Sequence, residues 1–159
     1  MERIPITLKG YNALKEELDR LRNVDSREVI LAIQEARGHG DLSENAEYDA
    51  AKERQGLIEA RINELEGKMS LFEVIDISQM SGDKVVFGAT VTLENLDTEE
   101  TREYMIVGSD EADISQGKIS VLSPLARALI GKKAGDDVIV QAPSGEVEYG
   151  IVKVEFIEK

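Results

Sequence analysis

Cysteine and tryptophan are absent from this chain of 159 residues, and it has a single histidine. Without cysteine there can be no disulfide, no thiol nucleophile and no Cys-ligated zinc, and one histidine cannot form a two-His metal motif. Aromatic residues make up only 4% of the chain, which leaves little for stacking nucleic-acid bases. No apolar run approaches the ~18–20 residues that span a membrane, and the first residues do not have the pattern of a secretion signal. We therefore expect a cytoplasmic protein with no membrane partner.

Basic residues are scarce relative to acidic ones. The chain has 19 Lys and Arg residues and 32 Asp and Glu residues, so its formal net charge is −13. Tight, sequence-independent binding to DNA needs clustered Lys and Arg that neutralise phosphates, so any DNA contact is expected to be weak or indirect. The charge does not exclude contact with a cation or with a basic channel.

The composition changes near residue 78, which predicts two domains, 1–78 and 79–159. The first domain is rich in Leu, Ile, Ala, Glu, Lys and Arg, which favour helices. The second domain holds most of the glycine and alternates Val, Ile and Thr with polar residues, which favours strands. A connection around residues 76–81 is expected between them.

The first domain has the heptad spacing of an antiparallel coiled-coil hairpin. In the first helix, apolar steps of four and three run from Tyr11 to Leu21 and slip around residues 23–27, and the frame resumes with Val29, Ile30, Ile33 and Ala36. In the second helix, steps of four and three alternate without a break through Ile58, Ile62, Leu65, Met69 and Phe72. The same frame extended backwards reaches Gln55, Ala51 and Tyr48. Gly38 and Gly40 end the first helix, and Asp41 can begin the second. All-α structure is therefore expected for this domain.

The second domain reads as a small α+β fold. Strands are expected over residues 84–93, with Gly88 as a bulge, and over 104–107, 118–122, 137–141 and 146–156. The pair Ser123-Pro124 has the form of a helix start, with Ser as the cap and Pro in the first turn, so a short helix is expected up to Ile130.

Two acids, Asp41 and Glu44, stand at the predicted tip of the hairpin, within residues 38–48. Spaced three apart at a helix start, they have the form of a capping box, with Asp41 as the cap. The same carboxylates could contribute oxygen ligands to Mg²⁺, although two ligands are too few to hold the ion without a partner. The spacing alone favours the structural interpretation.

The stretch from Glu35 to Tyr48, followed by Ala50-Ala51-Lys52-Glu53-Arg54-Gln55, closely resembles the tip of the bacterial Gre transcript cleavage factors, specifically the GreA type. The resemblance covers essentially the whole chain. It includes, in order, Ile4-Pro5-x-Thr7-Leu8-x-Gly10, Phe87-Gly88-Ala89-Thr90-Val91, Ile106-Val107-Gly108, Glu111-Ala112-Asp113, Ile119-Ser120 and Ser123-Pro124-Leu125-Ala126-Arg127. So many ordered matches are far more specific than one short motif.

The resemblance implies a transcription elongation factor that is not itself an enzyme. Such a factor inserts its coiled coil into the secondary channel of bacterial RNA polymerase. Asp41 and Glu44 then help to hold the second Mg²⁺ of the polymerase active centre, and the polymerase cleaves the 3′ end of a backtracked nascent RNA. No metal need be bound to the isolated protein.

Four further residues receive roles through the resemblance. Arg37 and Lys52 would contact the extruded RNA, although Asp25-Ser26-Arg27 stands where family members often carry a basic pair followed by Pro. The second domain would have an FKBP-like fold, and Ser123 and Pro124 would contact the polymerase at the rim of the channel. His39 is expected to be an exposed turn residue.

Two other hypotheses are kept as alternatives, a non-cleaving relative and a prolyl isomerase. A protein of this shape could plug the channel and inhibit transcription without cleavage, or act as a coiled-coil adaptor. An FKBP-like domain could also be a prolyl isomerase, but such pockets need a cluster of aromatic residues. The aromatic residues of the second domain are Phe87, Tyr104, Tyr149 and Phe156.

Overall fold

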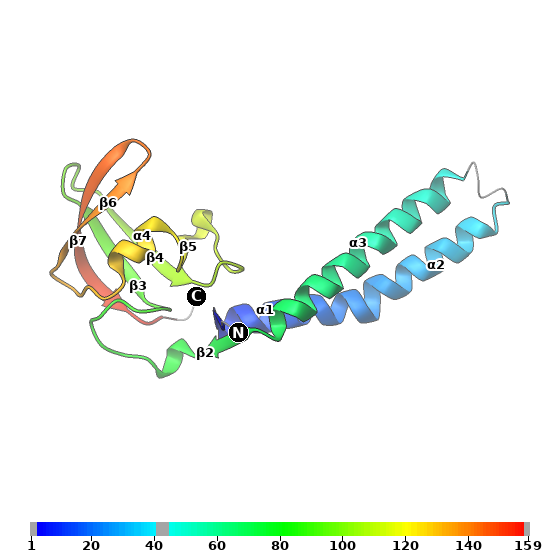
Figure 1. The fold of residues 1–159 in the computed structure, drawn as a ribbon, viewed down its shortest axis with the longest axis horizontal. Helices are drawn as coiled ribbons and strands as arrows, with labels where there is room; N and C mark the ends of the chain where they lie inside the picture. The colour runs from blue at the N-terminus through cyan, green and yellow to red at the C-terminus, as the bar shows by residue number, and fades with distance from the viewer. Residues whose placement is uncertain (1–2, 41–44, 158–159) are drawn as a thin grey trace. The chain divides into compact units, whose positions relative to one another are not determined.

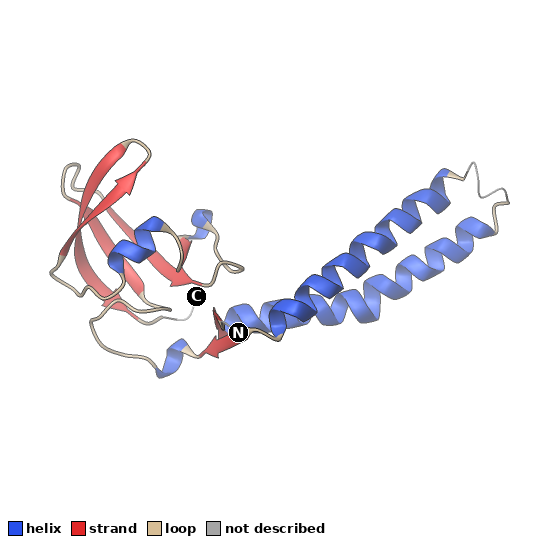
Figure 2. Ribbon diagram, viewed as in Figure 1, coloured by secondary structure: helices blue, strands red, loops and turns tan. Residues whose placement is uncertain are grey.

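The structure is a computed structural model in which residues 3–40 and 45–157 are described. Tyr11–Leu71 forms one compact unit, and the rest of the described chain forms a second. These units differ from the predicted domains 1–78 and 79–159, each of which is one continuous segment. The residues before Tyr11 belong to the second unit because they pair with a strand that follows the helices. Helices dominate the first unit and strands the second (Figure 2). No helix among the described residues is long and apolar enough to cross a membrane.

The helical unit is a hairpin of two arms that run in opposite directions (Figure 1). The first arm consists of α1 (Leu8–Arg20), a π-helix (Leu21–Asp25) and α2 (Ser26–Arg37). The second arm is α3 (Ala46–Met69), whose 24 residues make a helix about 36 Å long. The π-helix explains the predicted slip in the apolar frame, since a wider turn shifts every later side chain around the axis.

A thin apolar seam joins the arms. Its buried members are Leu18, Val29, Ile33 and Ala36 from the first arm, and Ala51, Ile58 and Leu65 from the second. The predicted heptad positions of α3 are all buried or half-buried as far as Met69. Two assignments were wrong. Phe72 lies in a strand beyond the end of α3, and Ile30 is 45% exposed although its spacing suggested the seam.

Ion pairs also link the two arms. Arg61 donates two parallel hydrogen bonds to Glu17, with Nε to Oε2 at 2.7 Å and Nη2 to Oε1 at 3.0 Å. Arg22 lies 3.1 Å from Glu66, and Arg54 lies 3.6 Å from Glu28. The hydrogen bonds from Arg61 lower the pKa of the Glu17 carboxyl below its ordinary value.

Replacing Glu17 by Gln should lower the free energy of unfolding by about 0.5 kcal/mol at neutral pH, because the pair is partly exposed to solvent. The folded-state pKa of Glu17 is lowered, so the stabilisation is complete above the ordinary carboxyl pKa and is lost as the pH falls through the lowered value. Urea unfolding across this range measures the difference. A Glu16→Gln variant, at a neighbouring exposed position, should show no such pH-dependent difference, and equal behaviour of the two variants would contradict the assignment.

The second unit contains two sheets. A parallel pair is formed by β1 (Ile4–Thr7) and β2 (Phe72–Ile75). The larger sheet has the strand order β5-β4-β3-β7-β6 and is antiparallel except for the β4–β5 pair. Its strands are β3 (Thr90–Asn95), β4 (Thr101–Val107), β5 (Lys118–Ser120), β6 (Asp137–Ala142) and β7 (Gly145–Glu155). The prediction did not include β1 and β2.

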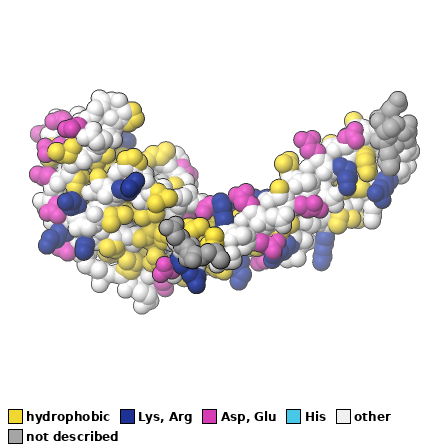
Figure 3. Space-filling view, in the orientation of Figure 1, with side chains coloured by type: hydrophobic (Ala, Val, Ile, Leu, Met, Phe, Trp, Pro, Cys, Tyr) yellow, Lys and Arg dark blue, Asp and Glu magenta, His cyan; other side chains and the backbone are white. Residues whose placement is uncertain are grey.

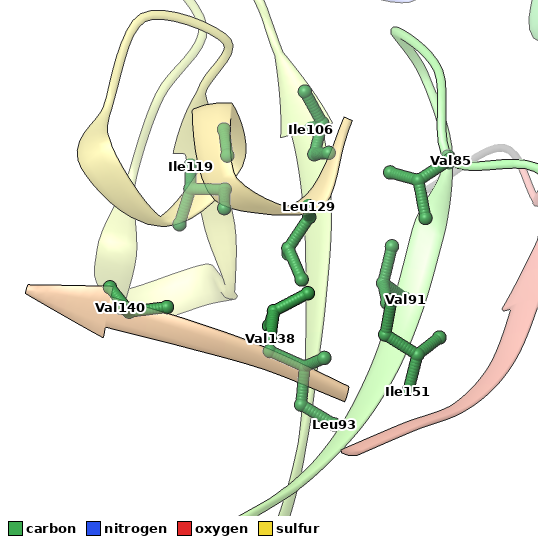
Figure 4. Packing of buried hydrophobic residues seen from close by; sticks show 11 residues of the cluster. Val85, Val91, Leu93, Ile106, Ile119, Leu129, Val138, Val140 and Ile151 are labelled. Carbon is green, nitrogen blue, oxygen red and sulfur yellow. The ribbon is translucent and has the colours of Figure 1, made fainter. Parts of the chain in front are cut away.

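One short helix, α4 (Pro124–Leu129), packs mainly against β6 and β5 on one face of the larger sheet. Between helix and sheet lies the main apolar core, part of which Figure 4 shows: Val85, Val91, Leu93, Ile106, Ile119, Leu129, Val138, Val140 and Ile151. On the opposite face Ile77 and Met80 pack against Met105 and Val107.

Two predictions about the strand expected over residues 84–93 need correction. The strand expected over 84–93 begins only at Thr90, because Gly88 adopts a φ of +88° in a turn, where a Cβ would meet the side chain of Ile77. The irregularity in pairing lies instead between Thr92 and Leu93, in the ladder with β7. The predicted connection over 76–81 contains a 3₁₀ turn, Ile77–Gln79, and Ile77 is buried.

Candidate functional site

Asn45 closes the described end of the hairpin. Its side chain accepts a hydrogen bond from the Tyr48 backbone N–H at 3.1 Å, which caps α3. Its Nδ2 also donates to the Ala36 carbonyl at 2.6 Å, near the end of α2. One amide therefore satisfies a terminal donor of one helix and a terminal acceptor of the other.

This geometry corrects the capping-box interpretation of Asp41 and Glu44. Because α3 begins at Ala46 with Asn45 as its cap, Asp41 is not the cap of that helix. Asp41 and Glu44 themselves lie outside the described residues. Within 3–40 and 45–157, no group of three or more potential metal-binding side chains occurs.

The other candidate residues near this end are exposed. Arg37 stands in the last turn of α2, and Lys52 stands in α3, where its Nζ donates to the side-chain Oε1 of Gln55 at 3.1 Å. His39 is exposed, as predicted, and its Nδ1 lies 2.8 Å from the Glu47 carboxylate. Figure 3 shows Lys and Arg side chains near this end of the hairpin, interspersed with acids. Arg37 and Lys52 are thus accessible from solvent on opposite arms.

Ser123 and Pro124, the predicted docking pair, begin α4 as their sequence predicts. Ser123 caps α4: its Oγ accepts from the Ala126 N–H at 3.3 Å and donates to the Ser120 carbonyl at 2.7 Å. The Ser123 hydroxyl is therefore occupied within the fold. Pro124 is exposed at the first helical position, and Leu122, which the prediction did not single out, is 71% exposed beside it.

Residues from three separate matching segments meet in one hydrogen-bond network. The Glu111 carboxylate accepts from the Thr7 N–H at 3.0 Å, from the Gly108 N–H at 2.9 Å and from the Thr7 hydroxyl. The Thr7 hydroxyl oxygen in turn accepts from the Gly10 N–H at 3.0 Å. The network joins the start of α1 to the chain that follows β4.

Close packing explains both glycines of this network. A Cβ on Gly108 would lie 2.5 Å from the Pro5 carbonyl oxygen, and a Cβ on Gly10 would collide with the Glu111 carboxylate. In the sequence, Thr7, Gly10, Gly108 and Glu111 belong to separate segments that resemble the Gre factors. Their spacing does not show that they are neighbours in the fold.

The aromatic residues considered for a prolyl isomerase pocket do not all line one cleft. Tyr104 and Tyr149 line one cleft, together with Leu93, Asn95, Glu100 and Arg102. Phe87 and Phe156 are not among its lining residues. The arrangement gives no support to the prolyl isomerase alternative.

Comparison with known families assigns the chain, nearly from end to end, to a class of transcription elongation factors. The family model described as "Transcription elongation factor, N-terminal" matches residues 4–74, and the model described as "Transcription elongation factor, GreA/GreB, C-term" matches residues 80–156. The chain therefore belongs to the GreA/GreB family of transcription elongation factors.

Individual relatives are similar over nearly their whole length. The chain is 60% identical to transcription elongation factor GreA of Neisseria meningitidis serogroup A, over 99% of this chain and 100% of the relative. It is 57% identical to the protein of the same name from Hyphomonas neptunium, over 98% and 99%. Among solved structures, one of the transcription factor Gfh1 is 30% identical, covering 98% of this chain and 99% of that chain, with a TM-score of 0.46.

Proposed function

We propose that this protein stimulates the cleavage of backtracked RNA by bacterial RNA polymerase. The helical unit is interpreted as an antiparallel coiled coil that enters the secondary channel of the polymerase. The sheet-bearing unit, a five-stranded sheet with one short helix on its face, is interpreted as an FKBP-like docking domain. The observation that carries the proposal is full-length membership of the GreA/GreB family combined with two acids in the connection between α2 and α3.

In this mechanism Asp41 and Glu44 supply oxygen ligands to a Mg²⁺ ion shared with the polymerase active centre. Carboxylates are the ligands that Mg²⁺ prefers, and two of them are too few to hold it alone. When bound, the ion activates water and stabilises the charge that develops at the phosphate. The protein thus delivers ligands, and the reaction belongs to the polymerase.

The cap made by Asn45 supports this separation of roles. Because Asn45 caps α3 and holds the Ala36 carbonyl, the hairpin end does not depend on Asp41 as a helix cap. Arg37 and Lys52, both exposed near this end, are proposed to contact phosphates of the extruded RNA.

A halted transcription complex with RNA labelled at its 5′ end tests the proposal. Addition of the protein with Mg²⁺ should shorten the RNA from its 3′ end and allow elongation to resume when nucleotides are added. Slower elongation without cleavage would instead identify a channel-plugging inhibitor, and no effect at saturating protein would contradict both.

Docking is proposed to rest on Leu122 and Pro124, with Ser123 acting through the cap. Leu122→Ser should weaken binding to the polymerase about tenfold, since burial of a leucine side chain contributes about 1.5–3 kcal/mol. Competition against labelled wild-type protein measures this affinity. Ile114→Ser is the matched control, because Ile114 is also 71% exposed in the same unit. Equal losses for the two variants would contradict the assignment of Leu122.

A further inference from the structure

A cleft in the sheet-bearing unit is not used by the proposed function. It has a volume of about 280 Å³ and is lined by six residues of β3, β4, β7 and the turn before β4: Leu93, Asn95, Glu100, Arg102, Tyr104 and Tyr149. Because α4 packs mainly over β5 and β6, this part of the sheet face stays open. In Figure 4, Leu93 lies with Ile151, its partner in the β3–β7 ladder, at one end of the core.

The strand register brings the lining side chains onto one face of the sheet. Leu93 pairs with Arg102 in β4, and Asn95 pairs with Tyr149 in β7. Tyr104 is two residues from Arg102 on the same strand, and side chains two apart share a face. Leu93 is 1% exposed and gives the cleft an apolar floor.

The polar groups of the cleft are not used by the fold. Within the described residues, the side chains of Glu100, Arg102, Tyr104 and Tyr149 neither donate nor accept a hydrogen bond and form no ion pair. Asn95 accepts from the Asp97 and Thr98 N–H groups through Oδ1, which leaves its Nδ2 as a donor. An arginine without an acidic partner is notable in a chain whose net charge is −13.

These groups define the chemistry of a ligand. Arg102, the two tyrosine hydroxyls and the Asn95 amide are donors, and a guanidinium binds a carboxylate through two parallel hydrogen bonds. The Glu100 carboxylate is an acceptor, suited to an amide N–H and opposed to a second negative charge. Leu93 and the two tyrosine rings suit an apolar side chain. The volume is at the small end for ligand sites, so it suits one residue better than a long ligand.

We propose that this cleft binds the C-terminal residue of a peptide chain, with an apolar side chain against Leu93, the free carboxylate on Arg102 and the amide N–H on Glu100. The proposal is independent of the hairpin and of transcript cleavage. A site of this kind would allow the sheet-bearing unit to bind a second protein by its C-terminus.

Acetyl-leucine and acetyl-leucinamide are suitable probes, since they differ only in the carboxylate. Titrated into the full-length protein labelled with ¹⁵N, acetyl-leucine should shift the amide signals of residues 93–104 and Tyr149, with a Kd of about 1 mM for so small a ligand. Acetyl-leucinamide should bind at least tenfold more weakly.

Arg102→Gln should weaken acetyl-leucine binding at least tenfold, and Tyr149→Phe should weaken it less. Arg127→Gln, a matched change of an exposed arginine in α4, should leave the Kd within twofold. Unchanged far-ultraviolet circular dichroism establishes that each variant is folded. Equal binding of the acid and the amide, full affinity in Arg102→Gln, or shifts outside the cleft would each overturn the proposal.

Discussion

Replacing Asp41 by Asn and Glu44 by Gln together should abolish most of the stimulation of transcript cleavage, with a fall in the cleavage rate of about 100-fold. This is the scale of effect seen when a group that stabilises transition-state charge is removed. Both replacements keep the size of the side chain and an acceptor oxygen, but they remove the negative charge that a Mg²⁺ ligand of this type supplies. The rate is measured on a backtracked complex at saturating protein.

The structure predicts that this variant stays folded. The cap of α3 is Asn45, and the seam that joins the arms is formed by residues before Gly38 and after Asn45, so neither acid is needed for them. Circular dichroism should be unchanged, and the variant should compete with wild-type protein for the polymerase.

A matched variant separates the metal hypothesis from a general effect of charge. Glu35→Gln with Asp49→Asn removes two exposed acids from the same end of the hairpin. It should retain cleavage within about twofold. Full cleavage by the Asp41/Glu44 variant, or an equal loss in the matched variant, would contradict metal binding by these two acids.

Replacing Glu111 by Ala should produce the largest loss of stability among single changes in the network that it organises. Its carboxylate accepts three hydrogen bonds, from Thr7 N–H, Gly108 N–H and the Thr7 hydroxyl. Hydrogen bonds to a charged group contribute about 1.5–3 kcal/mol each, and truncation leaves the donors unpaired unless water enters. Because Glu111 is only half-buried, water offsets part of this cost, and we expect a net loss of about 3 kcal/mol.

Thermal unfolding of the whole chain measures this loss, with an expected fall of about 10 °C in Tm. Glu111→Gln keeps one acceptor oxygen and should lose less. Glu148→Ala, which removes an exposed carboxylate from β7, serves as the control and should change Tm little. If Glu111→Ala behaved like Glu148→Ala, the network would not hold β1 and the start of α1 in place.

Periodic and local signals were enough to predict much of the fold. The uninterrupted heptads of α3 and the slip in the first arm correspond to a regular helix and a π-helix. The helix start at Ser123-Pro124 is also confirmed, because a capping side chain and a proline act within a few residues of themselves.

Pairing between distant segments could not be predicted in this way. β1 and β2 are four residues each and pair across the whole hairpin, and Phe72 fits the heptad frame of α3 as well as it fits a strand. Residue type alone does not distinguish Asn45 from Asp41 as the cap of α3, because Asn and Asp are equally suitable caps. The contacts that Glu111 makes with Thr7 also depend on the tertiary fold.

One four-residue sequence shows where local information ends. Asp-Ile-Ser-Gln occurs at residues 76–79 and again at 113–116. Both copies form a 3₁₀ turn capped by the Asp side chain, which accepts from the Ser N–H at 3.0 Å in the first copy and 3.1 Å in the second. Yet Ile77 is 3% exposed and Ile114 is 71% exposed. The sequence specifies the turn, whereas the rest of the fold decides whether it is buried.

The Mg²⁺ dependence of transcript cleavage tests the central claim most directly. If the protein supplies ligands for a weakly held ion, its addition should lower the Mg²⁺ concentration that gives half-maximal cleavage, and the Asp41/Glu44 variant should return that concentration to the value of polymerase alone. A faster maximal rate at an unchanged half-maximal Mg²⁺ concentration would show that the protein acts on cleavage without contributing to the metal site.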